Sequence, residues 1–130
     1  MSYNPMIKIE TETGEWILSH NFSSGGYLED KMFEVTSSLC RQGLASPTNE
    51  SSGGYPTVVK VHKATDSVKE IMLPVIEEIL SPKHTLFHVW RTLKEREALE
   101  KYKHKMNVQL EALKSFPDDE GFIITAWGTL

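Results

Sequence analysis

The residues best suited to chemistry are the histidine, arginine and lysine side chains between positions 84 and 105. His88 and Arg91 are three residues apart, and Lys101 follows in a segment rich in further lysines. A histidine transfers protons near neutral pH, and an arginine or lysine stabilises the charge that develops on a phosphate. These residues fit a small metal-independent ribonuclease-like domain, in which His88 handles protons while Arg91 and Lys101 contact phosphate.

The same cationic segment also suits nucleic-acid contact without catalysis. From Arg91 to Lys105, six lysine or arginine residues stand against three glutamates, which gives a local charge of +3. The candidate nucleic-acid-binding residues are Arg96, Lys101, Lys103 and Lys105. The simpler interpretation is a solvated helix face on which pairs four residues apart, such as Glu97 with Lys101, neutralise one another.

The pentapeptide Ser-Ser-Gly-Gly-Tyr occurs twice, at residues 23–27 and 51–55. The first copy precedes an expected helix, whose free N–H groups attract anions, and its glycines let a ligand approach the backbone. The candidate ligand-binding residues are Ser23, Ser24, Gly25 and Gly26. No Gly-Lys-Ser/Thr sequence follows, so two exposed turns are the alternative interpretation.

The positions of three histidines could indicate a zinc site. His84 and His88 are four residues apart, and His62 belongs to another expected strand. Three imidazoles suit zinc, but no cysteine or carboxylate stands at ligand spacing, so we expect no metal site. No motif predicts a cofactor. The sole cysteine, Cys40, is expected to be a buried helix residue without a disulfide partner in the chain.

The periodicity of apolar side chains predicts the elements that position these groups. Residues 57–62 alternate as in a strand, and residues 67–80 have the three- and four-residue spacing of an amphipathic helix. The other expected elements are strands near 7–10, 16–19, 84–93 and 122–127 and helices over 28–42 and 94–114. The apolar strand residues, including Trp16, are expected in the core.

The central helix has recognisable start and break signals. Ser67 and Glu70 have the spacing of a capping box, with Thr65 and Asp66 as alternative caps. Pro74 lies inside the helical pattern, where it removes a backbone hydrogen bond. We therefore expect a kink at Pro74 or two short helices.

The element order ββαβαβαβ predicts one α+β domain over residues 1–130. We expect a mixed sheet of about five strands packed with three helices, because helical connections allow parallel strands. The Ser-, Gly- and Pro-rich stretch over 44–54 is expected to form a flexible loop.

Net charge and hydropathy disfavour several classes of function. The chain has 14 Lys or Arg and 18 Asp or Glu residues, a formal net charge of −4. This charge disfavours general binding to nucleic acid or anionic membranes, which leaves residues 91–105 as the candidate nucleic-acid surface. No segment has the ~18 apolar residues of a membrane span, and the N-terminus lacks a leader pattern. We expect a soluble, cytoplasmic protein.

These observations favour a small non-enzymatic protein that binds a macromolecular partner, most simply a protein, as inhibitor, immunity and viral accessory proteins do. Acidic surface outside residues 91–105 would then steer a basic partner. One alternative is the ribonuclease-like domain that uses His88, Arg91 and the cationic helix. The other is a structural subunit of a larger assembly, joined through an open sheet edge.

Overall fold

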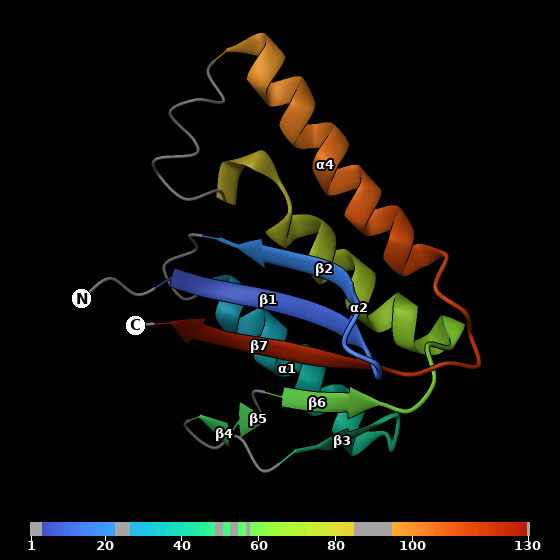
Figure 1. Cartoon of the computed structure of the whole chain (residues 1–130). Helices are drawn as coiled ribbons and strands as arrows, with labels where there is room; N and C mark the ends of the chain where they lie inside the picture. Colours follow the sequence, from blue (N-terminus) through green and yellow to red (C-terminus); the bar gives the residue numbers. More distant parts are fainter. Residues whose placement is uncertain are drawn as a thin grey trace.

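A five-stranded antiparallel sheet is the centre of the computed structural model, which describes residues 4–22, 27–48, 51–52, 55–56, 58–84 and 95–129. Its strands are β1 (Asn4–Thr11), β2 (Trp16–Asn21), β3 (Ala45–Pro47), β6 (Val58–Val61) and β7 (Phe122–Thr129). They lie in the order β2-β1-β7-β6-β3 (Figure 1). The last of these strands in sequence, β7, therefore joins β1 to β6 at the middle of the sheet.

The described residues also contain three α-helices: α1 (Tyr27–Arg41), α2 (Asp66–Ile79) and α4 (Arg96–Lys114). Helices α1 and α2 lie behind the sheet in Figure 1, and α4 runs along the β2 side. The 3₁₀ helix η1 (Pro82–His84) follows α2, and the short strands β4 (Ser51–Ser52) and β5 (Tyr55–Pro56) pair beside α1. In this part of the chain, no helix combines the length and apolarity that a membrane crossing requires.

The core lies between one face of the sheet and the helices. Ile9 pairs with Leu18 on one side and Ile124 on the other, and Ile124 pairs with Val59. All four side chains are buried, and each such burial contributes about 1.5–3 kcal/mol. The helix residues packed in the same core recur at three- and four-residue steps: Leu28, Met32, Val35 and Leu39 from α1, and Val68, Met72, Ile76 and Ile79 from α2.

The local predictions for the first part of the chain are confirmed. β1 and β2 form the expected hairpin, with Gly14 at a φ of +89° that a glycine adopts without strain. α1 spans residues 27–41, and Gly43 follows its end with a φ of +74°. The long helix and the last strand also form, as α4 and β7.

The prediction of a mixed sheet is wrong, because every strand pair in the described sheet is antiparallel. A single crossing helix between β6 and β7 would have returned the chain in parallel. Instead α2 runs back from the end of β6, and α4 runs forward again before β7 begins (Figure 1). The end of β6 therefore pairs with the start of β7, Val61 with Phe122.

The fifth strand of the sheet is also not the one expected. Ala45–Pro47, within the predicted loop 44–54, forms β3 and pairs with Val59–Val61 of β6. His84, the expected first residue of a strand over 84–93, instead lies in η1, and residues 85–94 lie outside the described residues. The flexibility of the rest of the 44–54 stretch stays a prediction.

The start of α2 is set by Thr65 and not by Ser67. The Thr65 hydroxyl accepts a hydrogen bond from the Val68 N–H at 3.4 Å, so the alternative cap is the one that forms. α2 is one helix with Pro74 inside it, so the alternative of two short helices is wrong, and the alternative of a kink at Pro74 stays a prediction. The buried face of α2 belongs to the same core as the strand residues, and its burial offsets the lost backbone hydrogen bond.

The edges of the sheet are partly covered. On β2, the Ser19 N–H donates to the Gln109 side-chain oxygen of α4 at 2.9 Å, which occupies a donor that another strand would otherwise use. The opposite edge strand, β3, is short and ends at Pro47. Trp16, expected in the core, is 71% exposed, because it begins β2 at the sheet edge where the register with β1 shifts.

Lys69 of α2 connects that helix to the end of α4. Its side chain is buried, and the ammonium donates to the carbonyl oxygens of Lys114 at 3.1 Å and Phe116 at 2.6 Å. The third donor bonds to the Asp118 carboxylate at 3.1 Å. An ammonium has three donors, so all are used, and carbonyls at a helix end that lack helical partners are satisfied. Lys69 thereby fixes the start of the loop that leads to β7.

We predict that Lys69→Met lowers the free energy of unfolding by roughly 2 kcal/mol, because two part-buried carbonyls lose their donor. Asp118→Asn should cost less, under about 1 kcal/mol, because the Asp118 carboxylate is 66% exposed. Urea denaturation measures both. Lys63→Met removes an exposed lysine and serves as the matched control; equal stability of the Lys69 and Lys63 variants would contradict the prediction.

We predict that Thr65→Ala destabilises the protein by about 1 kcal/mol, the usual cost of losing a helix N-cap. Ser67→Ala should change stability by less than about 0.5 kcal/mol, as for other exposed positions. Thermal or urea unfolding of the two variants separates these caps. A larger loss of stability in the Ser67 variant than in the Thr65 variant would contradict this prediction and favour the capping box of Ser67 and Glu70.

Candidate functional site

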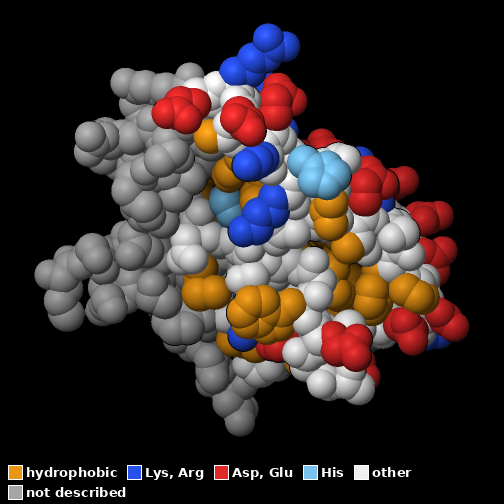
Figure 2. Space-filling model, turned by 45° about the horizontal axis from the view of Figure 1, so that its top comes forward, with side chains coloured by type: hydrophobic (Ala, Val, Ile, Leu, Met, Phe, Trp, Pro, Cys, Tyr) orange, Lys and Arg blue, Asp and Glu red, His pale blue; other side chains and the backbone are white. Residues whose placement is uncertain are grey.

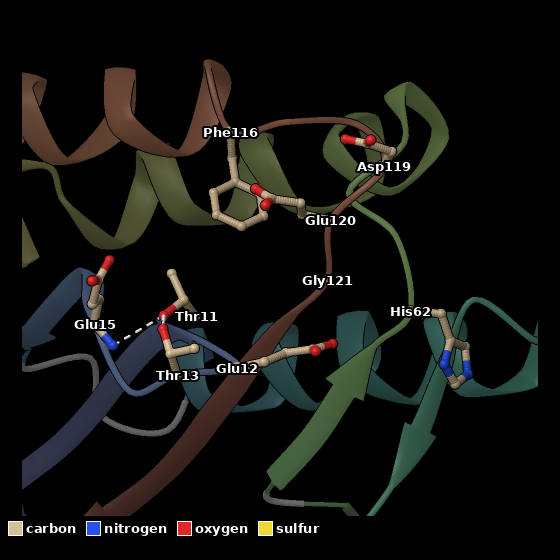
Figure 3. Close-up of a pocket in the computed structure, with 9 residues that line it drawn as sticks. All are labelled: Thr11, Glu12, Thr13, Glu15, His62, Phe116, Asp119, Glu120 and Gly121. Carbon is tan, nitrogen blue, oxygen red and sulfur yellow. Dashed lines mark hydrogen bonds between the residues drawn. The ribbon is translucent and has the colours of Figure 1, made fainter.

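A cleft lined largely by acidic residues lies at one end of the sheet, and we call it the acidic cleft (Figure 3). It has a volume of about 520 Å³. The β1–β2 turn, the loop before β7 and the residue after β6 meet there. The lining residues are Thr11, Glu12, Thr13, Glu15, His62, Phe116, Asp119, Glu120 and Gly121.

Hydrogen bonds hold the hairpin side of the acidic cleft. The Thr11 hydroxyl accepts from the Glu15 N–H at 3.0 Å and lies 3.0 Å from the Thr13 hydroxyl. The backbones of Thr11 and Glu15 also bond at 2.8 Å, and the Gly14 N–H donates to the Thr11 carbonyl. The turn that carries Glu12 and Glu15 is therefore ordered by its own residues.

The opposite side of the cleft is held against the sheet. The Glu120 carbonyl accepts from the Ala64 N–H at 2.8 Å, and the Phe116 ring packs edge-to-face on Phe122, with centroids 5.6 Å apart. At Gly121 the backbone lies so close that a Cβ would press on the Val61 carbonyl and lie 2.8 Å from the Glu12 carboxylate. A glycine is therefore required for the loop to close on the end of β6.

The charges of the acidic cleft are only partly balanced. Glu12 lies 3.5 Å from the Lys60 ammonium, and both side chains are about half exposed. Glu15, Asp119 and Glu120 form no ion pair with another residue of the described ranges. His62 is hydrogen-bonded to the Ser46 hydroxyl at 2.9 Å. Exposed carboxylates gathered in this way attract cationic groups and accept their hydrogen bonds.

Several residues singled out from the sequence fall outside the described structure. His88 and Arg91, the proposed catalytic pair, belong to the stretch 85–94. Ser23, Ser24, Gly25 and Gly26, the proposed anion ligands, also lie outside the described residues. The ribonuclease hypothesis and the ligand role of the Ser-Ser-Gly-Gly sequence therefore stay predictions.

The cationic residues of the long helix are all described and exposed: Arg96, Lys101, Lys103 and Lys105. The expected pairing of Glu97 with Lys101 does not occur within 4.0 Å, and none of the four cations pairs with a carboxylate of the described chain. α4 therefore presents four exposed cationic side chains that form no ion pair with a described carboxylate.

Of the candidate metal ligands, His62 and His84 are described and lie near opposite ends of α2, and His88 lies outside the described residues. His62 lies just before the start of α2, and His84 lies in η1 just after its end. His84 is 3.9 Å from the Glu78 carboxylate. In the described ranges, no three His, Cys, Asp or Glu side chains are placed to hold a metal. Cys40 is half-buried in α1, and its burial raises the pKa of the thiol.

Sequence reasoning missed His20, which lies between β2 and α4. Its Nε2 is 3.4 Å from the Tyr102 hydroxyl, and that hydroxyl donates to the Leu80 carbonyl at 3.1 Å. Burial, followed by the positive charge of Lys105, lowers the pKa of His20 to about 4, so the imidazole is neutral near pH 7. Burial also raises the pKa of Tyr102 to about 12.

Only weak sequence signals could have found these groups. The alternation that buries Leu18 also turns His20 inward, and Tyr102 belongs to the apolar stripe of α4. The acidic cleft joins the hairpin turn to a loop more than a hundred residues later, because Thr11 pairs with Phe122. The sequence predicts an acidic turn at Asp118 and Asp119. It does not predict that Glu12 and Glu15 lie across the cleft from that turn.

No protein-family model, curated protein or solved structure matches this chain. Two charged surfaces lie within the described residues. They are the acidic cleft and the cationic side of α4.

We predict that stability falls by roughly 2 kcal/mol as the pH drops from about 7 to about 5, because His20 takes up a proton more readily in the unfolded chain. The folded pKa lies below the unfolded value near 6.5, so stability is full above ~6.5 and is lost as the pH falls towards 4. Urea unfolding at several pH values measures the slope. His20→Gln should flatten it and His104→Gln, at an exposed position, should not; an unchanged slope in both would contradict the assignment.

Proposed function

We propose that this protein is a non-enzymatic binding protein whose acidic cleft holds a basic segment of a protein partner. The observation that carries the proposal is the meeting of four carboxylates from two distant segments around one ordered cleft, those of Glu12, Glu15, Asp119 and Glu120. The backbone on both sides is already hydrogen-bonded in place. A partner would therefore meet a preformed acidic surface and would not have to order it.

The chemistry of the cleft suits lysine or arginine side chains. A guanidinium can bond two carboxylate oxygens at once, and Phe116 offers apolar surface to an aliphatic stem. Each exposed ion pair contributes less than about 1 kcal/mol, so affinity requires several pairs in one peptide. A folded or extended basic segment of a protein supplies such a series.

Long-range charge supports the same partner. The chain has a formal net charge of −4, although residues 91–105 carry a local +3, so the remainder of the chain carries −7. Such a field accelerates the approach of a basic partner and weakens with salt. This mode of action suits an inhibitor, immunity or accessory protein that covers a basic surface without chemistry of its own.

The test is a titration of ¹⁵N-labelled protein with a short peptide of alternating lysine and arginine, and with a neutral peptide of equal length. We expect amide shifts at residues 11–15 and 119–121 with the basic peptide only. Glu15→Gln combined with Glu120→Gln should weaken this binding by up to roughly 10-fold, as expected for two exposed pairs. Added salt should weaken it further.

The matched control is Glu97→Gln combined with Glu100→Gln, which removes two exposed carboxylates from α4. It should leave the affinity within about twofold, because screening separates these charges from the cleft. If both double variants lose affinity equally, the cleft is not the binding site. Shifts confined to α4 would likewise overturn the proposal.

A further inference from the structure

A second group of polar side chains lies at the junction of β2 and α4, at the other end of β2 from the acidic cleft. Lys101 and Lys105 are one helical turn apart and therefore lie on the same side of α4. Tyr102 contacts His20 there, with ring centroids 6.2 Å apart. We call His20, Lys101, Tyr102 and Lys105 the β2–α4 cluster. Figure 2 shows lysine or arginine side chains beside histidine side chains on the face that α4 presents.

The two lysines of this cluster have no carboxylate at ion-pair distance among the described residues, which is also true of Lys63, Lys83 and Lys103. Each of five described lysines lies within 3.7 Å of a carboxylate: Lys8, Lys31, Lys60, Lys69 and Lys114. Lys101 and Lys105 have no such partner in the described ranges, although Glu97 and Glu100 are close in sequence. Two adjacent unpaired cations beside an imidazole and a hydroxyl form an arrangement that an anion would complete.

We propose that the β2–α4 cluster binds a phosphate group, free or carried by a small phosphorylated molecule, with Lys101 and Lys105 as its charged ligands. Tyr102 and His20 line the inner side of this site. The Tyr102 proton is donated to the Leu80 carbonyl, so the hydroxyl is held in place and its oxygen faces the imidazole. The site is independent of the acidic cleft and of any partner bound there.

The protonation of His20 reports whether an anion is bound. The charged groups that face His20 from the described elements come from α4: Lys105 carries a charge, and Tyr102 is neutral. Its neighbour on β1, Ile7, is apolar. Lys105 lowers the pKa of His20, and a phosphate on Lys105 would oppose that effect. Binding and proton uptake are then coupled, as linkage requires.

The experiment follows the histidine ring signals by NMR across pH, in inorganic phosphate and in sodium chloride of equal ionic strength. We expect phosphate to raise the His20 midpoint by about one pH unit, the effect of a nearby opposite charge. His62, which lines the acidic cleft at the other end of β2, is the internal reference, and its ring signals should respond equally to pH in the two salts. Equal His20 midpoints in the two salts would overturn the proposal.

Two lysine variants distinguish specific phosphate binding at this site from non-specific screening of charge by salt. Lys105→Gln should raise the His20 midpoint in chloride, because the repelling charge is gone, and should abolish the further rise in phosphate. Lys103→Gln removes the same charge from another side of α4, beside Pro82, and should leave both midpoints as in the unmodified protein. If the two variants behave alike, the effect is screening and the site does not exist.

Two further ligands distinguish the source of the phosphate group. Ribose 5-phosphate should reproduce the phosphate effect on His20, and ribose should not, if the site accepts small phosphorylated molecules. A response to inorganic phosphate alone restricts the site to the free ion. A single-stranded oligonucleotide that shifts amides along all of α4 while phosphate leaves His20 unchanged would replace the site by a nucleic-acid surface.

Discussion

One buried ammonium group, that of Lys69, holds together the parts of the protein that carry its charged surfaces. It donates to two carbonyls at the end of α4 and to Asp118 in the following loop, so α2, α4 and the approach to β7 share one anchor. A buried ammonium without these partners costs several kcal/mol, which makes the anchor hard to release. The acidic cleft lies next to the loop that Lys69 holds. The β2–α4 cluster lies on α4, the helix whose end Lys69 holds in place.

The local spacing of apolar residues predicted much of the fold. Apolar spacing located α1, α2 and α4, and alternation located the hairpin and the last strand. Strand direction could not be read in this way, because it depends on how α2 and α4 together carry the chain between β6 and β7. The strand Ala45–Pro47 was equally invisible, since three residues have no periodicity and their extended form comes from pairing with β6.

The sites were less accessible to sequence than the fold. The exposure of the cationic residues on α4 followed from helix periodicity, but the absence of a Glu97–Lys101 pair within the described chain depends on side-chain geometry. His20 and Tyr102 are 82 residues apart, and their contact arises only when α4 packs on β2. The acidic cleft likewise exists because β1 and β7 are neighbours, a pairing that no local motif encodes.

The central place of β7 affects how the protein is made. The β1–β2 hairpin and the β3–β6 pair are synthesised early, yet they meet only through residues 122–129. Ribosomes add roughly 5–20 residues per second, so the isoleucine and valine faces of both pairs stay uncovered for several seconds during translation. Until β7 emerges, β1 and β6 therefore lack the strand that each pairs with in the folded protein, and any early pairing of β1–β2 or β3–β6 leaves a strand edge open to chaperones or to neighbouring chains.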